Sequence, residues 1–245
     1  MEPGIFSTVF YLPLYNTLVL ILSAVHGANV GVAIVLLTLV VRTALLPLSH
    51  KSVTSQAKMR TLAPHLEKLK EKHKDNKQEQ ARKTMELYKE HGINPFSGCL
   101  LVLIQLPIIF ALYFVFFKGL PNLNTEHLYS FVHLPSTVSM MFLGIVLSKK
   151  SIILALFAAI TQYYQIKLSI PAMAPAEQGA KPSFKDDFAR SFNVQMRYML
   201  PVIVFGVSYS ISAAVALYWT TSNLFSIGHE LYVKRKASEL DVKSS

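Results

Sequence analysis

The apolar stretch that decides the fold runs from Val30 to Leu48 and reads VGVAIVLLTLVVRTALLPL. A helix needs about 20 largely apolar residues to cross a bilayer, and this stretch meets that length with one charged residue, Arg42. Long runs without Asp, Glu, Lys or Arg also cover residues 3–41, 91–117, 127–148, 151–166 and 198–229. Because these runs are continuously apolar and do not alternate, they predict spanning helices and not a transmembrane barrel.

The low content of charged residues narrows the possible class of protein further. Charged residues make up 16% of the 245 residues, against about 25% in soluble domains. This excludes an ordinary soluble enzyme, a disordered chain and a disulfide scaffold, since Cys99 is the single cysteine. We predict an all-α, polytopic membrane protein with basic extramembrane segments. The start of the chain has no features of a cleavable leader or transit peptide, which favours a bacterial cytoplasmic (inner) membrane.

The first charge-free run is too long for one span and is interrupted at Gly27-Ala28-Asn29-Val30-Gly31. We expect residues 1–28 to form a helix in the outer interface, centred on Ile5 to Val25, and residues 29–49 to form span 1. The alternative is that both segments cross the membrane, which would move the N-terminus to the other side.

Residues 50–93 form a polar segment that we predict to be a cytoplasmic helical hairpin. Apolar residues recur at helical spacing in two stripes, namely Met59, Leu62, Leu66 and Leu69, and then Ala81, Met85 and Tyr88. Asp75-Asn76 is a turn signal between them. The later segments are expected to be span 2 at 94–117, an outer loop with an interfacial stretch at 118–149, span 3 at 150–170, a cytoplasmic loop at 171–195, span 4 at 196–209, span 5 at 211–233 and a cytoplasmic tail at 234–245.

The orientation of this five-span core follows from the basic residues in its loops. The hairpin, residues 167–197 and the tail hold 20 Lys and Arg, whereas Lys118, Lys149 and Lys150 are the 3 on the opposite side. The hairpin and the C-terminus are therefore expected in the cytoplasm. A competing topology with residues 127–148 as a span would spoil this asymmetry, so we disfavour it.

Arg42 is the outlier at membrane depth. An arginine there costs about 2.5–3.5 kcal/mol on insertion scales and marks a functional site by default. The alternative is snorkelling to the nearby interface. We place no acidic residue inside the spans, so the charge has no evident partner. Enzyme and metal-binding motifs are absent from the sequence, and we predict no catalytic activity, metal or cofactor.

Further polar residues lie in four of the predicted spans. They are Thr38 in span 1, Gln105 in span 2, Gln162 and Gln165 in span 3, and Trp219, Ser222 and Asn223 in span 5. The alternative for each polar residue alone is hydrogen bonding between helices. Taken as a set with Arg42, they predict a shared, hydrated and positively charged groove.

Three segments resemble the YidC/Oxa/Alb family of membrane protein insertases. They are Gly31-Val32-Ala33-Ile34 through Arg42-Thr43-Ala44-Leu45-Leu46-Pro47-Leu48; Asn94-Pro95 with Gly98-Cys99-Leu100 and Gln105-Leu106-Pro107-Ile108; and Met199-Leu200-Pro201 with Leu217-Tyr218-Trp219 and Ser222-Asn223-Leu224. The resemblance implies a five-span core whose groove is open to cytoplasm and lipid. It assigns Arg42 as the groove arginine and the other seven polar residues as groove candidates.

The resemblance implies an insertase and chaperone for membrane proteins. We expect Arg42 to capture polar tails of nascent membrane proteins. The apolar helix of the guest, which is the protein being inserted, is expected to slide along spans 3 and 5 into lipid. The basic hairpin 50–91 and the tail are expected to contact ribosome, Sec translocon and signal-recognition receptor, but not DNA; anionic lipid is an equal alternative for the hairpin. A small-solute or ion transporter and an assembly factor for a respiratory complex are alternative functions.

Overall fold

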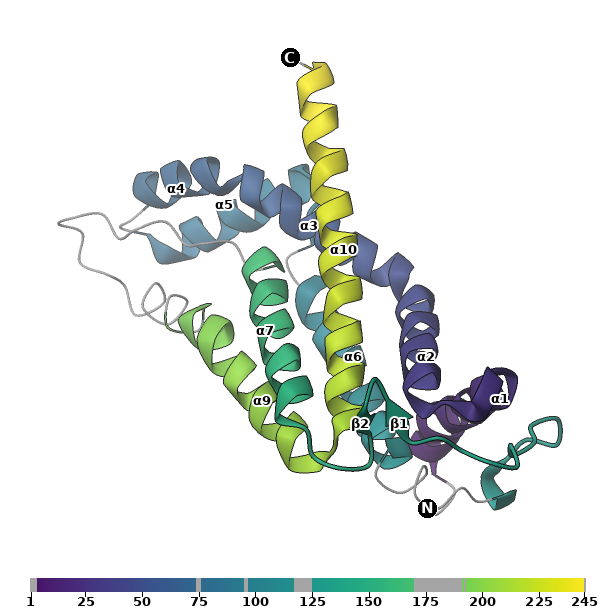
Figure 1. Ribbon diagram of the computed structural model, residues 1–245. Coiled ribbons are helices and arrows are strands. Elements are labelled where there is room, and N and C mark those ends of the chain that lie inside the picture. The colour runs from purple at the N-terminus through teal and green to yellow at the C-terminus, as the bar shows by residue number, and fades with distance from the viewer. Residues whose placement is uncertain are drawn as a thin grey trace.

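The structure is a computed structural model that describes residues 4–73, 76–94, 97–116, 125–169, 191 and 193–244. The chain is mostly helical, as predicted. Most of the expected cytoplasmic loop 171–195 and the first part of the expected outer loop lie outside the described residues. The helices α2, α6, α7, α9 and α10 gather into a bundle, and α3, α4 and α5 extend from one end of it (Figure 1).

The N-terminal segment is helical and ends at a sharp turn. A π-helical turn, Ser7–Tyr11, continues into α1, Leu12–Ala24. Gly27 then adopts a φ of +71°, which reverses the chain into α2, Val30–Ala44. Asn29 caps α2, because its side-chain oxygen accepts hydrogen bonds from the N–H groups of Gly31 and Val32 at 3.0 and 3.2 Å. Consequently α1 lies at an angle to α2 at the base of the bundle (Figure 1).

The first predicted span differs from the structure at its end. We expected it to reach residue 49, but α2 ends at Ala44 and α3, Leu46–Thr61, leaves at a bend of 64°. Pro47 explains the bend, since its ring cannot donate to the helix and crowds the carbonyl four residues earlier. The polar segment therefore begins with α3, and only then come α4, Ala63–Lys72, and α5, Lys77–Glu90, which contact each other.

The remaining bundle helices are α6, Ser97–Phe114, α7, Ile152–Ser169, α9, Leu200–Ile211, and α10, Ala213–Ser244. The π-helical turn Gln195–Met199 leads into α9. Ser212 alone is extended between α9 and α10, within the turn expected near residues 209–212. Helix α10 continues through the segment that we expected to be a tail, because residues 234–244 contain no Gly or Pro to end it.

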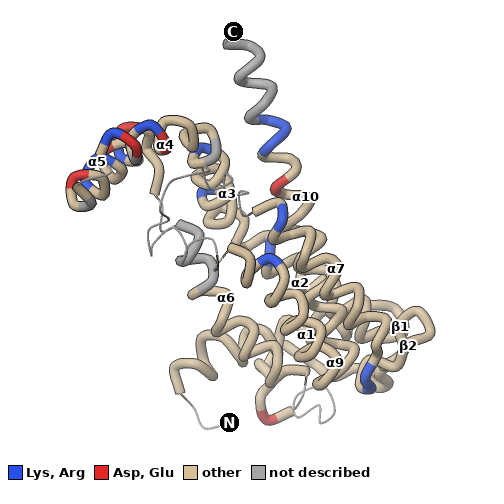
Figure 2. Tube along the Cα trace, turned by 90° about the vertical axis from the view of Figure 1, so that its left-hand side faces the viewer, with Lys and Arg blue, Asp and Glu red and all other residues tan. Residues whose placement is uncertain are grey.

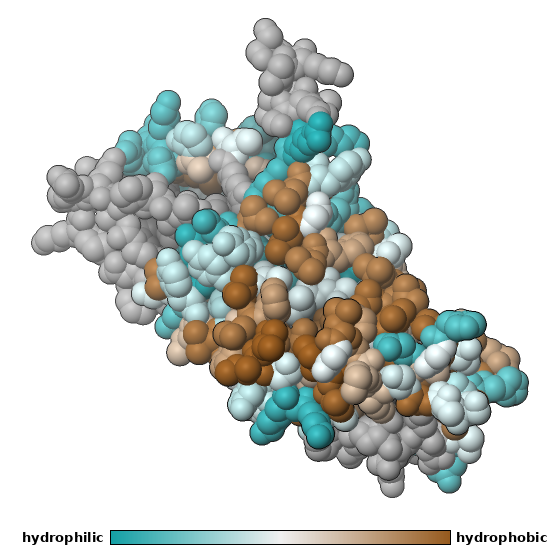
Figure 3. Space-filling model, in the orientation of Figure 1, coloured by the Kyte–Doolittle hydropathy of each residue, from teal (hydrophilic) through white to brown (hydrophobic). Residues whose placement is uncertain are grey.

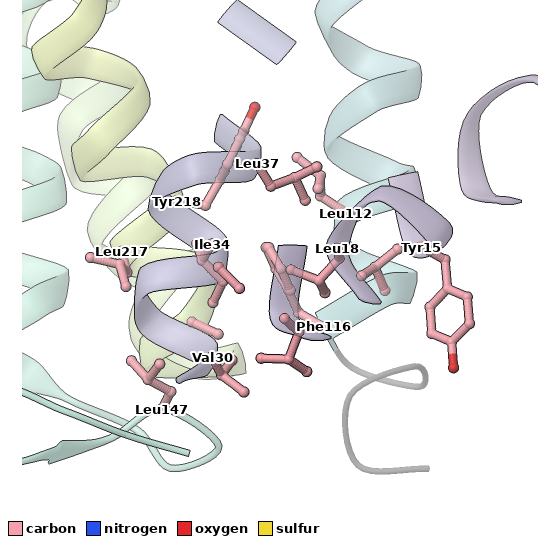
Figure 4. Close-up of a cluster of buried hydrophobic side chains, with 14 of the residues drawn as sticks. Tyr15, Leu18, Val30, Ile34, Leu37, Leu112, Phe116, Leu147, Leu217 and Tyr218 are labelled. Carbon is pink, nitrogen blue, oxygen red and sulfur yellow. The ribbon is translucent and has the colours of Figure 1, made fainter. Parts of the chain in front are cut away.

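The core lies where α1, α2, α6 and α10 meet. Figure 4 shows Leu37 of α2 next to Leu112 of α6, and both are buried, as are Val30 and Ile34 of α2 and Leu217 of α10. Helix α7 packs mainly against α10 and α9 on the other side of the bundle. Thus α10 is the central helix that contacts both groups.

Residues 125–149 correct the all-α prediction in one place. They hold a single 3-10 turn, Thr125–His127, and a two-stranded antiparallel hairpin, β1, Met141–Phe142, with β2, Ile145–Val146. Leu143 and Gly144 between the strands both have positive φ, as in the turn that joins two-residue hairpins. The competing topology, with residues 127–148 as a spanning helix, is therefore wrong.

The described residues contain two helical segments that are long and apolar enough to cross a membrane, Ser7–Ala24 and Ile152–Ser169. The bent pair α2–α3 makes a third if it forms one span. The five-span core stays a prediction. The apolar part of α6 that could be assessed is Leu103–Phe114, and α9 has 12 residues, so both are shorter than a full span. Figure 3 shows apolar surface gathered over the side of the bundle, and Figure 2 shows charges concentrated on α3–α5 and α10.

Gly31 allows the β1–β2 hairpin to approach α2. A Cβ atom at this position would overlap the ring of Phe142. We therefore expect Gly31→Ala to destabilise the fold by about 1–3 kcal/mol, the usual cost of overpacking. The measurement is thermal unfolding in detergent micelles.

Gly206 provides the matched control, because it also lies in a helix but has open space around its position. Gly206→Ala should be neutral or slightly stabilising. Adding Phe142→Ala to Gly31→Ala should restore part of the lost stability, and an unchanged melting temperature for Gly31→Ala would contradict the packing shown here.

Candidate functional site

Arg42 of α2 is held by a hydroxyl group of α10. Its Nε donates to Ser222 Oγ at 2.8 Å, and its Nη2 donates to the same oxygen. Ser222 is almost fully buried. Among the described residues no carboxylate lies within ion-pair distance of Arg42. The guanidinium is therefore fixed in position by a neutral partner, and its charge is not compensated.

A second hydrogen bond adjoins this contact. Gln105 Nε2 of α6 donates to Tyr218 Oη of α10 at 2.8 Å. Tyr218 lies one helical turn before Ser222, so both face the same side of α10. We call Arg42, Ser222, Tyr218 and Gln105 the arginine cluster. It joins α2, α6 and α10, and it contains three of the eight sequence-predicted groove residues.

Thr38 and Trp219 lie outside the arginine cluster. Thr38 is buried and its hydroxyl donates to the Ile34 carbonyl at 2.6 Å, so it is satisfied within its own helix. Trp219 is half-buried and lines an apolar cavity of about 320 Å³ between α6, α9 and α10. Other residues lining this cavity are Phe110, Tyr113, Val207, Ile211 and Val215.

The remaining three candidates lie along the contact between α7 and α10. Asn223 Nδ2 lies 3.4 Å from the Ala158 carbonyl and 3.3 Å from Thr161 Oγ1, so it bonds the two helices together. Gln162 donates to Gln165 at 3.2 Å, and Gln165 donates to Ser169 Oγ at 2.9 Å. The structure thus divides the predicted set: Asn223 acts between helices, which was the alternative interpretation, and the two glutamines are not in the arginine cluster.

Glu230 was missed by sequence reasoning, which placed no acidic residue inside the spans. It is 3% exposed on α10, within the segment expected to be span 5. Ser169 donates to its Oε2 at 2.7 Å, and Lys234 Nζ lies 3.2 Å from its Oε1. Lys234 also donates to the Leu168 carbonyl at 2.8 Å, at the end of α7. The Glu-x-x-x-Lys spacing at the end of an apolar run was the available signal.

We call Glu230, Lys234 and Ser169 the α7–α10 clasp. It continues the hydrogen bonds that run from Gln162 through Gln165, so polar contacts follow the α7–α10 contact from membrane depth to its charged end. Close by, His50 of α3 and His229 of α10 bring ring nitrogens within 3.2 Å. No three His, Cys, Asp or Glu side chains gather at a possible metal site within the described part of the chain.

The sequence of residues 21–240 matches the model of a known family, described as 60Kd inner membrane protein. The chain belongs to this family. It is 32% identical over 244 residues to a Clostridium perfringens protein named membrane protein insertase YidC, covering 93% of this chain and 94% of that protein. Proteins of the same name from Fusobacterium nucleatum and Clostridium tetani are 30% identical over 216 residues and 34% identical over 205.

These two relatives are also matched over most of their length. The alignment covers 87% of this chain and 90% of the Fusobacterium nucleatum protein, and 84% of this chain and 81% of the Clostridium tetani protein. The region matched by the family model, residues 21–240, includes α2, α6, α7, α9 and most of α10. Family membership and the apolar helices together place the chain among multi-pass inner membrane proteins.

Proposed function

We propose that this chain is a membrane protein insertase and chaperone that captures polar tails of nascent membrane proteins and releases their apolar helices into lipid. The observation that carries this proposal is Arg42, a charged side chain inside an apolar bundle whose hydrogen-bond partner is the neutral hydroxyl of Ser222. The names of its relatives support the same activity. The proposed action involves no covalent chemistry.

Electrostatic capture follows from the arginine cluster. A charge in a low-dielectric region attracts an opposite charge much more strongly than in water. An acidic residue of a guest can replace the hydroxyl as the partner of Arg42, and Ser222, Tyr218 and Gln105 offer hydrogen bonds to other polar groups of the tail. This lowers the cost of bringing the tail to membrane depth, and burial of the guest's apolar helix in lipid then drives completion.

We propose an exit route different from the one expected from sequence. Spans 3 and 5 were expected to guide the guest, but α7 and α10 pack closely against each other and are tied together by Asn223 and the α7–α10 clasp. We propose instead that the guest's helix leaves along the apolar cavity between α6, α9 and α10, where Trp219 lies. Its aromatic and aliphatic walls present no charge to an apolar helix.

The orientation and partners belong to the same proposal. We place α3–α5 and the C-terminal end of α10 in the cytoplasm, and α1 in the outer interface. Residues 51–90 carry 11 Lys and Arg and 6 Asp and Glu, a net charge of +5. This basic segment is proposed to receive nascent chains and to contact ribosome, Sec translocon or signal-recognition receptor, with anionic lipid as the competing partner.

The two alternative functions, a transporter and an assembly factor, can each be tested. A transporter built around the same cluster would produce solute or ion flux in liposomes, whereas an insertase would not. An assembly factor restricted to one respiratory complex would insert a single class of guest. Glu230, the carboxylate within the predicted span 5, is paired with Lys234, so it supports the α7–α10 clasp and not an ion pathway.

Site-specific crosslinking tests the proposed path. A photoreactive residue at Phe110 or Trp219, which line the apolar cavity, is expected to crosslink to a membrane protein stalled during synthesis. Leu156 is the matched control, because it is an exposed apolar residue of α7 outside that cavity. Equal crosslinking from Leu156 and from the cavity positions would rule out this exit route.

A further inference from the structure

The tip of the β1–β2 hairpin exposes large apolar side chains. Leu143 is 86% exposed and Met141 is 55% exposed. The ring of Phe142, between them, faces Gly31 of α2. Because successive side chains of a strand point to opposite faces, Met141 of β1 points away from α2, and Leu143 is exposed in the turn that follows.

Leu143 also occupies a backbone position that suits other residues. It has a φ of +48° and is followed by Gly144 with a φ of +79°. Turns with two positive φ values favour Asn-Gly or Asp-Gly, and a bulky residue in this region is a genuine outlier. A leucine there gains little packing against the described residues, so its apolar surface is not explained by the fold of the hairpin itself.

The base of the hairpin is fastened to the first turns of two bundle helices. Val30 N–H of α2 donates to the Ser139 carbonyl at 3.0 Å. Ala213 and Ala214 of α10 donate to the carbonyls of Lys149 and Leu147 at 2.8 and 3.1 Å. The hairpin is therefore rigidly attached to the helices that carry Arg42 and Ser222, at the end of the bundle opposite α3–α5 (Figure 1).

Two exposed lysines, Lys149 and Lys150, lie three and four residues after the end of β2 and precede α7. Lys150 lies over the ring of Tyr209, 5.7 Å from its centre. An apolar hairpin tip, with a pair of basic residues and an aromatic ring at the base of the same hairpin, is a combination that suits the boundary between lipid headgroups and acyl chains. Figure 2 shows that the hairpin projects sideways from the bundle.

We propose that the β1–β2 hairpin is a lipid-contact element that inserts Leu143 and Met141 into the interfacial region of one leaflet, with Lys149 and Lys150 at its phosphate groups. Since Arg42 lies 12 residues after Val30, it is held about 18 Å along α2 from the hairpin's attachment. The inserted hairpin thus sets the depth of Arg42 in the bilayer. The lipid contact does not require the insertase activity proposed above.

Fluorescence from single cysteines tests this contact. Cys99 is replaced by serine, and Leu143→Cys is labelled with an environment-sensitive dye in vesicles of phosphatidylcholine and phosphatidylglycerol. We expect blue-shifted emission that is quenched by lipids brominated near the headgroup end of the acyl chains. Ser136→Cys is the control, because Ser136 is exposed in the same loop outside the hairpin, and its dye should emit as in water. Equal emission at the two positions would overturn the proposal.

Two further measurements distinguish lipid contact from burial of the tip by a second protein chain. Leu143→Asn suits the positive φ of the turn, so it should leave the melting temperature in detergent unchanged or raised, while a dye at Met141→Cys loses its blue shift in vesicles. A blue shift at position 143 that resists brominated lipid and depends on the protein-to-lipid ratio would show that a second chain covers the tip, and would also overturn the proposal. Both readouts are independent of guest insertion, so failure here is distinct from failure of the insertase activity.

Discussion

Arg42→Ala is expected to reduce insertion of a small membrane protein with an acidic N-terminal tail by about tenfold, which corresponds to about 1.4 kcal/mol. The reason is the loss of a charge that has no counterion among the described residues. Two opposite charges at contact distance attract by about 4 kcal/mol at an effective dielectric constant of about 20, and desolvation of the guest's carboxylate cancels part of this. The measurement is protease protection of the tail in membrane vesicles.

Arg42→Lys is the matched variant, since it keeps the charge but removes the planar group that reaches Ser222. It should retain most of the insertion. A guest whose tail acids are replaced by Asn and Gln should be much less sensitive to the charge at position 42. Unchanged insertion of the acidic guest by Arg42→Ala would refute charge capture, while the apolar exit path could still hold.

Lys234→Met is expected to lower the stability of the bundle by about 2 kcal/mol, because the buried carboxylate of Glu230 loses its lysine partner. Glu230 is the buried partner, and Lys234 also binds the Leu168 carbonyl at the end of α7. Helices α7 and α10 should then separate more readily at this end. Thermal unfolding in detergent measures the effect.

Lys236→Met serves as the control, since Lys236 is exposed two residues further along α10 and its replacement should change stability little. The double variant Glu230→Gln, Lys234→Met removes both charges and should recover much of the loss. If Lys234→Met and Lys236→Met unfold at the same temperature, the α7–α10 clasp does not stabilise the bundle.

Much of the fold was predictable because long apolar runs and proline positions act locally. The runs identified α2, α6, α7, α9 and α10, and the extended Ser212 lies where the α9–α10 turn was expected. The β1–β2 hairpin and the 64° bend at Leu45 were not foreseen. The hairpin depends on tertiary contacts that composition does not reveal, since residues 127–148 are as apolar as a spanning helix, whereas Pro47 was a local signal for the bend.

The site was predictable in part. An arginine in an apolar run is visible in sequence, and helical spacing puts Ser222 on one face with Trp219. Spacing does not show which neighbour each face meets, so Asn223, one residue from Ser222, turned out to contact α7. Tyr218 and Glu230 were missed for different reasons: tyrosine is common in apolar helices, and Glu230 lies next to a charged cluster that resembles an ordinary helix end.

Reconstitution is the sharpest test of the proposed insertase activity. The purified chain in liposomes, with no other protein, receives a freshly synthesised small membrane protein with an acidic N-terminal tail. We predict that the tail becomes protease-protected in these liposomes, and that protection falls to about a tenth with Arg42→Ala. Protection equal to that in protein-free liposomes would contradict the claim that this chain inserts membrane proteins.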